Sequence, residues 1–141
     1  MAKSDTKQHQ TNKIIYVVDP DSSICKRIAS LFTSSSCSVK TFTCAGDFLK
    51  QPEIVAGCLV LGIKMPGISA VELMQELKHL GIKIPIIVLC DRDDLPKAVE
   101  VMRAGALDFI GKPFTNQRLK ISIEKMLPGT TFLSIGSRTE Y

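Results

Sequence analysis

The stretch Cys58-Leu59-Val60-Leu61-Gly62-Ile63-Lys64-Met65-Pro66-Gly67 decides the fold of this chain. Its first four residues form an unbroken apolar run, which is typical of a strand covered on both faces, as in a parallel sheet. In open α/β sheets, the residue at the carboxyl end of such a strand faces the crevice that holds the chemistry. Here that residue is Gly62, which has no side chain to bind a metal or to accept a transferred group.

Apolar strands alternate with helical patterns along the rest of the chain. Four further strands are predicted at residues 14–18, 39–42, 84–89 and 107–110. A short helix is expected over 45–50, and four longer helices are expected where apolar residues recur at spacings of three and four. The expected buried sets of these four helices are Ile24, Ile28, Leu31 and Phe32; Leu73, Leu77 and Leu80; Val99 and Met102; and Leu119, Ile123 and Met126.

Capping residues indicate where three of these helices begin. Ser69, with Glu72 three positions later, forms a capping-box pattern. Asp93 or Asp94 can cap the next helix, which carries a proline in its first turn. Thr115 is a suitable N-cap for the last helix.

This alternation predicts an α/β fold, because each parallel crossover needs a helix of its own. Right-handed crossovers favour the flavodoxin-like (βα)5 arrangement, a five-stranded parallel sheet in the order 2-1-3-4-5 with helices on both faces. In that order Asp19, Gly62 and Cys90 lie at the carboxyl edge of neighbouring strands. Lys112 reaches the same edge from the last strand, so this edge is the candidate site.

Composition excludes several other classes of protein. The 141 residues, 45% of them apolar, are enough for one domain with a core, and no apolar run reaches the 18 or more residues of a membrane span. The polar start of the chain is no secretory signal, so we expect a cytoplasmic protein. Half of the net charge of +4 lies in the first thirteen residues, which argues against nucleic-acid binding by this chain alone. The five cysteines lack metal-binding spacing and are expected to be reduced thiols.

Three stretches, in this order, resemble the receiver domains of two-component response regulators. They are residues 15–19 (Ile-Tyr-Val-Val-Asp), residues 59–61 running into Met65-Pro66-Gly67, and residues 98–114 (Ala-Val-Glu-Val-Met-Arg-Ala-Gly-Ala-Leu-Asp-Phe-Ile-Gly-Lys-Pro-Phe). The similarity is closest to the subgroup usually joined to a helix-turn-helix output domain. It implies a non-enzymatic signalling module in a phosphorelay, with a histidine kinase or another regulator as its protein partner.

The resemblance also implies a role for each residue at the candidate site. The aspartate that accepts the phosphoryl group in a working receiver aligns with Gly62. Of the two acids that hold Mg²⁺, Asp19 matches one and Pro20 stands in place of the other. Cys90 replaces the switch hydroxyl and is a weaker donor, whereas the lysine that neutralises the phosphoryl group is kept as Lys112.

We therefore expect a pseudo-receiver, with no catalytic residue, no resident metal or cofactor, and weak or absent Mg²⁺ binding. Phe109 keeps the aromatic switch position. Such a protein would act by protein–protein interaction, through the surface of the last two helices and the strand between them. Lys97, Arg103, Lys120 and Ile121 belong to this surface, which could also form a homodimer.

Two alternatives remain open for the function. A switch could use another acidic residue, Asp21, Asp91 or Asp93, although these acids are more simply explained as helix caps or solvated turn residues. Cys90 could be redox-active if Lys112 lowered its pKa, although a small buried hydrophobe is the simpler explanation.

We also expect three structural features, of which only the cis bond is implied by the family resemblance. Lys112 is expected to form an ion pair with Asp19 across the emptied pocket, and its bond to Pro113 is expected to be cis. A disulfide between Cys58 and Cys90 is not expected, because they would lie ~13 Å apart along adjacent strands.

The expected domain organisation follows from the extent of the resemblance. We expect residues 1–12 to be a mobile tail, residues 13–127 to be the receiver-like domain, and residues 128–141 to be a C-terminal extension. That extension is too short to form an output domain, so this chain is expected to act through another protein.

Overall fold

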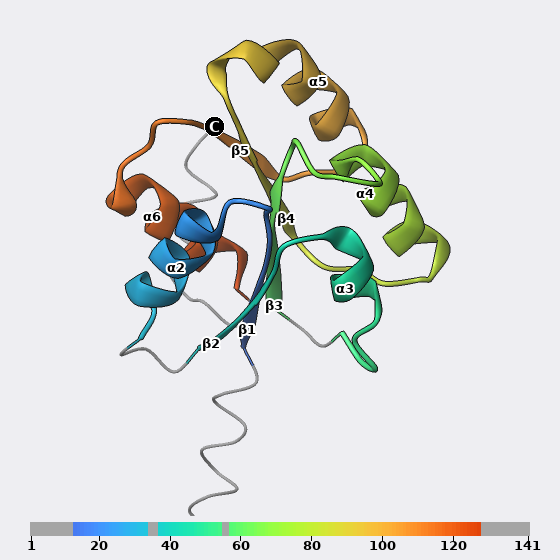
Figure 1. Cartoon of the computed structure of the whole chain (residues 1–141), viewed down its shortest axis with the longest axis horizontal. Coiled ribbons are helices and arrows are strands. Elements are labelled where there is room, and N and C mark those ends of the chain that lie inside the picture. Colours follow the sequence, from blue (N-terminus) through green and yellow to red (C-terminus); the bar gives the residue numbers. More distant parts are fainter. Residues whose placement is uncertain (1–12, 34–36, 55–56, 128–141) are drawn as a thin grey trace, which may run out of the picture.

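Five parallel strands form one sheet in the order β2-β1-β3-β4-β5 (Figure 1). The structure is a computed structural model, and it describes residues 13–33, 37–54 and 57–127. The expected tail and extension, residues 1–12 and 128–141, lie outside the described residues. The sheet order confirms the predicted flavodoxin-like fold. The strands are β1 (Ile14–Val18), β2 (Ser38–Phe42), β3 (Gly57–Gly62), β4 (Ile86–Cys90) and β5 (Asp108–Gly111).

Helices cover both faces of the sheet, as Figure 1 shows, with α2 and α6 on one side and α3 and α4 on the other. The bounds are α2 (Ser22–Leu31), α3 (Ala45–Leu49), α4 (Ala70–His79), α5 (Leu95–Arg103) and α6 (Asn116–Met126), with a single 3₁₀ turn, η1 (Arg92–Asp94), before α5. Among the described residues, no helix is both long and apolar enough to cross a membrane.

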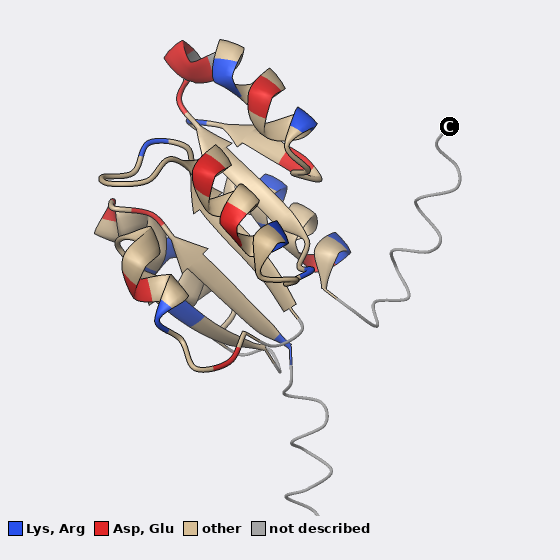
Figure 2. Cartoon of the chain, turned by 90° about the vertical axis from the view of Figure 1, so that its right-hand side faces the viewer, with Lys and Arg blue, Asp and Glu red and all other residues tan. Residues whose placement is uncertain are grey.

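The core consists of two apolar clusters, one on each face of the sheet. Tyr16 and Val18 of β1 pack with residues of α3, α4 and α5, while Ile15 and Val17 pack with residues of α2 and α6. Both sets are completely buried, so β1 needs apolar residues at successive positions rather than at alternate ones. Figure 2 shows the consequence, because the charged residues lie mainly on helices and loops while most of the strand surface is uncharged.

Two of the predicted helix caps are present as expected. Ser69 Oγ accepts the backbone N–H of Glu72 at 3.1 Å, and Glu72 Oε1 accepts the backbone N–H of Ser69 at 2.8 Å. This is the reciprocal pair of a capping box. At the start of α6, Thr115 Oγ1 accepts the backbone N–H of Arg118 at 3.0 Å.

Three residues that we expected in the core are exposed instead. Leu80 is 54% exposed because it lies just after α4, as the C-cap residue, and leaves the buried stripe. Val99 and Met102 of α5 are 54% and 39% exposed. The residues of α5 that face the sheet are Ala98 and Val101, one position earlier in each case. The prediction failed there because Ala98 is too small to stand out as part of an apolar stripe.

Candidate functional site

Four strand ends meet at one edge of the sheet, as the predicted order requires. Asp19 follows β1, which pairs with β3 up to the partners Val18 and Leu61. Gly62 therefore lies beside Asp19 at the end of β3, and Cys90 ends β4. Lys112 follows β5, and its backbone N–H donates to the carbonyl oxygen of Cys90 at 2.7 Å.

Asp19 is buried at this edge, with 3% of its surface exposed. Its Oδ1 accepts the backbone N–H of Asp21 at 2.9 Å. Its Oδ2 lies 4.0 Å from Nζ of Lys112, which is the ion pair expected from the sequence. Within the described residues, this Oδ2 atom has no hydrogen-bond partner.

Asp19 and Asp21 differ in how firmly they hold a proton. Burial raises the pKa of Asp19 above its ordinary value, and the hydrogen bond from Asp21 and the charge of Lys112 offset this only in part. The pKa of Asp21 is lowered instead, chiefly because the hydroxyl and the backbone N–H of Ser23 donate to its carboxylate. Asp21 thus acts as the N-cap of α2, one of the simple roles considered for it above.

The space beside Gly62 is occupied by the side chain of Asp19. A Cβ atom placed on Gly62 would lie 2.5 Å from Oδ2 and 2.8 Å from Cγ of Asp19, closer than real Cβ contacts allow. The position that the family resemblance gives to the phosphoacceptor therefore has no side chain, and the acid of β1 extends into its space.

Cys90 is 1% exposed, and its pKa is raised rather than lowered. Burial is the largest cause, followed by the charges of Asp94 and Asp91, and the opposing effect of Lys112 is the smallest. Lys112 acts to lower the pKa of this thiol but is outweighed, which favours the simpler explanation of Cys90 as a small buried hydrophobe over a redox-active thiol. Cys58, whose pKa burial raises to about 12, and Cys90 are both free, so no disulfide joins them.

A second cluster of charges joins the loops after β3 and β4. Nζ of Lys64 lies 3.8 Å from Oδ2 of Asp91 and 3.6 Å from Oδ2 of Asp94. Asp94 occupies the N-cap position of α5, but its side chain makes no capping hydrogen bond, so that prediction was only half right. Sequence analysis missed this cluster, because only the adjacency of β3 and β4 places Lys64 beside these acids.

The donor set at this edge is a poor match for Mg²⁺, the metal that the fold family implies. Magnesium takes oxygen ligands, and Asp19 offers one carboxylate that already faces the ammonium group of Lys112. Pro20, at the place of the second acid, supplies no carboxylate. Within the described ranges, no group of three or more His, Cys, Asp and Glu side chains is placed to hold a metal ion.

The loop that carries Lys112 is held by a contact that sequence reasoning also missed. The Lys112–Pro113 peptide bond is cis, as expected. Arg27 of α2 donates through Nη2 to the carbonyl oxygen of Phe114 at 2.6 Å and through Nε to Oδ1 of Asn116 at 2.5 Å. Its guanidinium group also lies over the ring of Phe114, 4.4 Å from the centroid.

The predicted partner face is formed by α5, β5 and α6, and we call it the α5–β5–α6 face. Lys97, Arg103 and Lys120 are exposed on it, and Ile121 is 38% exposed. Phe109 is partly buried against the core. The exposed apolar residues of α5 described above add apolar surface to the helix that contributes Lys97 and Arg103.

A hydrogen-bond network joins β5 to α6 within this face. Oδ2 of Asp108 accepts the hydroxyl of Ser122 at 2.7 Å and pairs with Nη1 of Arg118 at 3.2 Å. Oδ1 of Asp108 accepts Nη2 of Arg118 at 3.3 Å, so the arginine binds both carboxylate oxygens. Arg118 and Ser122 share one side of α6, but the sequence alone did not indicate that Asp108 faces them.

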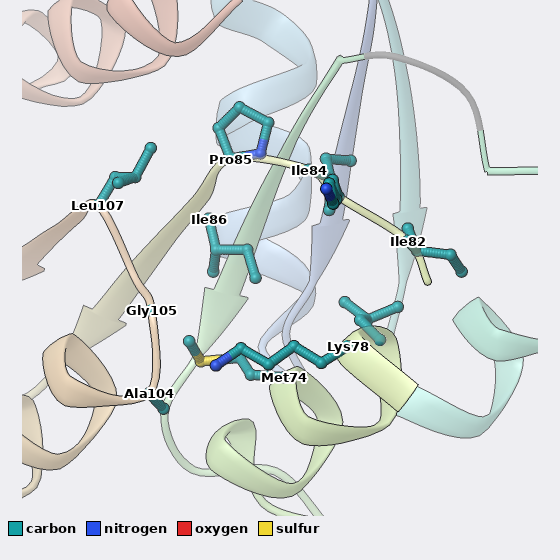
Figure 3. Close-up of a pocket in the computed structure, with 11 residues that line it drawn as sticks. Met74, Lys78, Ile82, Ile84, Pro85, Ile86, Ala104, Gly105 and Leu107 are labelled. Atoms are coloured by element: carbon teal, nitrogen blue, oxygen red, sulfur yellow. The ribbon is translucent and has the colours of Figure 1, made fainter. Parts of the chain in front are cut away.

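A cavity of about 480 Å³ lies at the opposite end of β4 (Figure 3). Apolar residues of α4, β4 and the connecting loops line it, among them Met74, Ile84 and Leu107. The Lys78 side chain extends across this cavity toward Gly105, just beyond the end of α5. Its positive charge there complements the negative end of that helix. Because the cavity is at the start of the strands, it is separate from the candidate site.

Comparison with known proteins identifies a family. The model of the response regulator receiver domain matches residues 15–124. The chain is 36% identical to the response regulator protein TmoT of Ectopseudomonas mendocina, over 86% of this chain and 56% of that protein. It is 39% identical to the transcriptional regulatory protein FixJ of Rhizobium meliloti, over 82% of this chain and 57% of FixJ. The chain thus spans little more than half the length of these relatives.

A solved structure agrees with these sequence relatives. The crystal structure of FixJ-N superposes with a TM-score of 0.73 at 38% identity, covering 81% of this chain and 92% of that one. The structural match thus extends over nearly the whole of that domain.

Proposed function

Because this chain belongs to the response regulator receiver domain family, we propose that it serves two-component signalling as a pseudo-receiver. It does not accept a phosphoryl group at the usual position, and it acts by binding another protein through the α5–β5–α6 face. The observation that carries this proposal is the glycine at the acceptor position, with the Asp19 carboxylate lying in the space of the missing side chain.

The chemistry of phosphoryl transfer supports this proposal. Transfer depends on a placed acceptor and on cations that neutralise the charge of the phosphoryl group. At the acceptor position Gly62 offers only backbone, and Lys112 already faces a carboxylate. Cys90 presents a buried thiol with a raised pKa where a hydroxyl would bond the phosphoryl oxygens, and this also disfavours a thiol-based switch.

In this proposal the partner is another protein of two-component signalling. TmoT and FixJ are regulators by name, and a histidine kinase, another regulator or a second copy of this chain would suit the exposed basic and apolar residues of the α5–β5–α6 face. Such a partner would place the protein in the cytoplasm.

Acetyl phosphate with Mg²⁺ tests the chemical half of the proposal. We expect the intact mass of the protein to stay unchanged, while a receiver domain that keeps its acceptor aspartate gains one phosphoryl group under the same conditions. A phosphorylated peptide that contains Asp19, Asp21, Asp91 or Asp93 would contradict the proposal and identify the acid that replaces the usual acceptor.

Charge reversal on the α5–β5–α6 face tests the other half. The variant Arg103→Glu/Lys120→Glu should lose its partner in a pull-down from the source cell. The control variant Lys26→Glu/Lys40→Glu changes the net charge equally, at exposed positions on α2 and β2. Equal recovery of the partner by both variants would show that another surface binds it.

A further inference from the structure

The Asp19 side chain lies directly against Gly62, in the space that a side chain at position 62 would need. We propose that Asp19, paired with Lys112, fills the space that the acceptor side chain has in a working receiver, and that this makes a glycine necessary at position 62. In this proposal Gly62 is maintained by one neighbouring side chain and not by the fold. It deepens the proposed function, on which its meaning for signalling rests.

The backbone of Gly62 places no demand on the residue type. The described glycines with positive φ are Gly67, Gly81 and Gly105, so Gly62 has a conformation open to any residue. It lies in regular β3 and pairs with Leu89 of β4. The three atoms nearest to a Cβ placed on Gly62 all belong to the side chain of Asp19, at 2.5, 2.8 and 3.4 Å. The atoms that crowd an added Cβ most closely therefore belong to that carboxyl group and not to the backbone.

Asp19 cannot withdraw without losing its own contacts. Its Oδ1 holds the backbone N–H of Asp21 at 2.9 Å, and its Oδ2 lies 4.0 Å from Nζ of Lys112. With 3% of its surface exposed, the carboxylate would lose these contacts without full replacement by water. A side chain at position 62 must therefore displace a buried group that is bonded on one oxygen and paired on the other.

The charges around the Asp19 carboxylate also disfavour a second acid at position 62. Lys112 attracts it, while Asp21 and Asp91 repel it. A second carboxylate at position 62 would add to that repulsion as well as to the crowding. Restoring the acceptor alone, by Gly62→Asp, should therefore not recreate a working receiver pocket.

A double-mutant cycle tests the proposal, with urea unfolding of the wild type, Gly62→Ala, Asp19→Ala and the double variant at pH 7 without divalent cations. We expect Gly62→Ala to lower the folding equilibrium constant roughly 5- to 150-fold in the wild type, the usual cost of overpacking. In the Asp19→Ala background, Gly62→Ala should lower the folding equilibrium constant by less than about 3-fold. In the matched control, Gly111→Ala at the end of β5, an added Cβ meets no atom within 4 Å.

The variant Asp19→Asn separates shape from charge. Asparagine keeps the shape of the side chain, so Gly62→Ala should still lower the folding equilibrium constant strongly in the Asp19→Asn background. If Gly62→Ala destabilised the Asp19→Ala variant as much as the wild type, the proposal would be overturned, because the backbone would then require the glycine.

A measurement on a single variant keeps the proposal testable should Asp19→Ala fail to fold. In Gly62→Ala the displaced carboxylate releases the N–H of Asp21, whose hydrogen exchange should become faster than in Gly111→Ala. Unchanged exchange would overturn the proposal. None of these readouts uses a phosphoryl donor, so their failure is distinct from phosphorylation of the wild type, which would refute the proposed function.

Discussion

The two glycines at the ends of β3 are alike in strand and residue type but differ in what excludes a side chain. A Cβ on Gly57 would overlap the carbonyl oxygen of Ile14, a backbone atom of the paired strand β1. A Cβ on Gly62 would meet the end of the Asp19 side chain at 2.5 Å. The first glycine is thus required by the sheet itself, and the second by a residue of the candidate site. Only at position 62 could the replacement of one other side chain allow a larger residue.

The substitution Gly57→Ala should have the largest effect on stability. The carbonyl oxygen of Ile14 belongs to the backbone of an interior strand, so the two strands must separate locally to admit a methyl group. We expect a loss of about 3 kcal/mol or more in the free energy of unfolding, the upper range for overpacking. Urea unfolding measures this, with Gly111→Ala as the control that changes stability by less than about 1 kcal/mol. Similar losses in Gly57→Ala and Gly111→Ala would show that the carbonyl oxygen of Ile14 is not what excludes a side chain at position 57.

Restoring both missing acids should have an intermediate effect. The variant Gly62→Asp/Pro20→Asp places two carboxylates beside Asp19, where like charges repel and space is short. Without Mg²⁺ its thermal midpoint should fall by on the order of 5–10 °C, and added Mg²⁺ should recover part of this loss. Differential scanning calorimetry with and without the metal measures both shifts. A thermal midpoint equal to that of the wild type in metal-free buffer would show that the added carboxylates neither repel nor crowd Asp19.

The smallest expected effect is on the pH dependence of stability. Because burial raises the pKa of Asp19 above the ordinary value of 3.8, the folded protein holds this proton more firmly than the unfolded chain. The resulting stabilisation is complete below pH 3.8 and is lost as the pH rises through the raised pKa of the folded state. Asp19→Asn lacks this titration, so the stability of the wild type relative to this variant should decline as the pH rises from about 4. Urea unfolding across this range measures the difference, and a difference that grows with pH would reverse the direction assigned to Asp19.

Sequence reasoning recovered the fold because its signals are local. The unbroken apolar runs at 14–18 and 58–61 predicted the buried strands, and the crossover rule then predicted their order. The same order brought Asp19 and Lys112 to one edge, so their ion pair was predictable as well.

The missed contacts are pairs between loops or elements that are distant in the sequence. The contact of Lys64 with Asp94 depends on where two loops meet, and that of Arg27 with Phe114 on where α2 meets the loop after β5. No local sequence pattern encodes either distance. The exposure of Val99 was missed for a related reason, because the sheet accepts the small Ala98 in its place.

By itself, the sequence determined that the middle strand ends without a carboxylate, because glycine has no side chain in any fold. It also determined that proline follows Asp19, so the first strand does not end in a pair of adjacent acids. Only the tertiary structure decided where the acid points. The pairing of β1 with β3 sets Asp19 directly against Gly62, and the absent side chain leaves room for its carboxylate to reach across to that position.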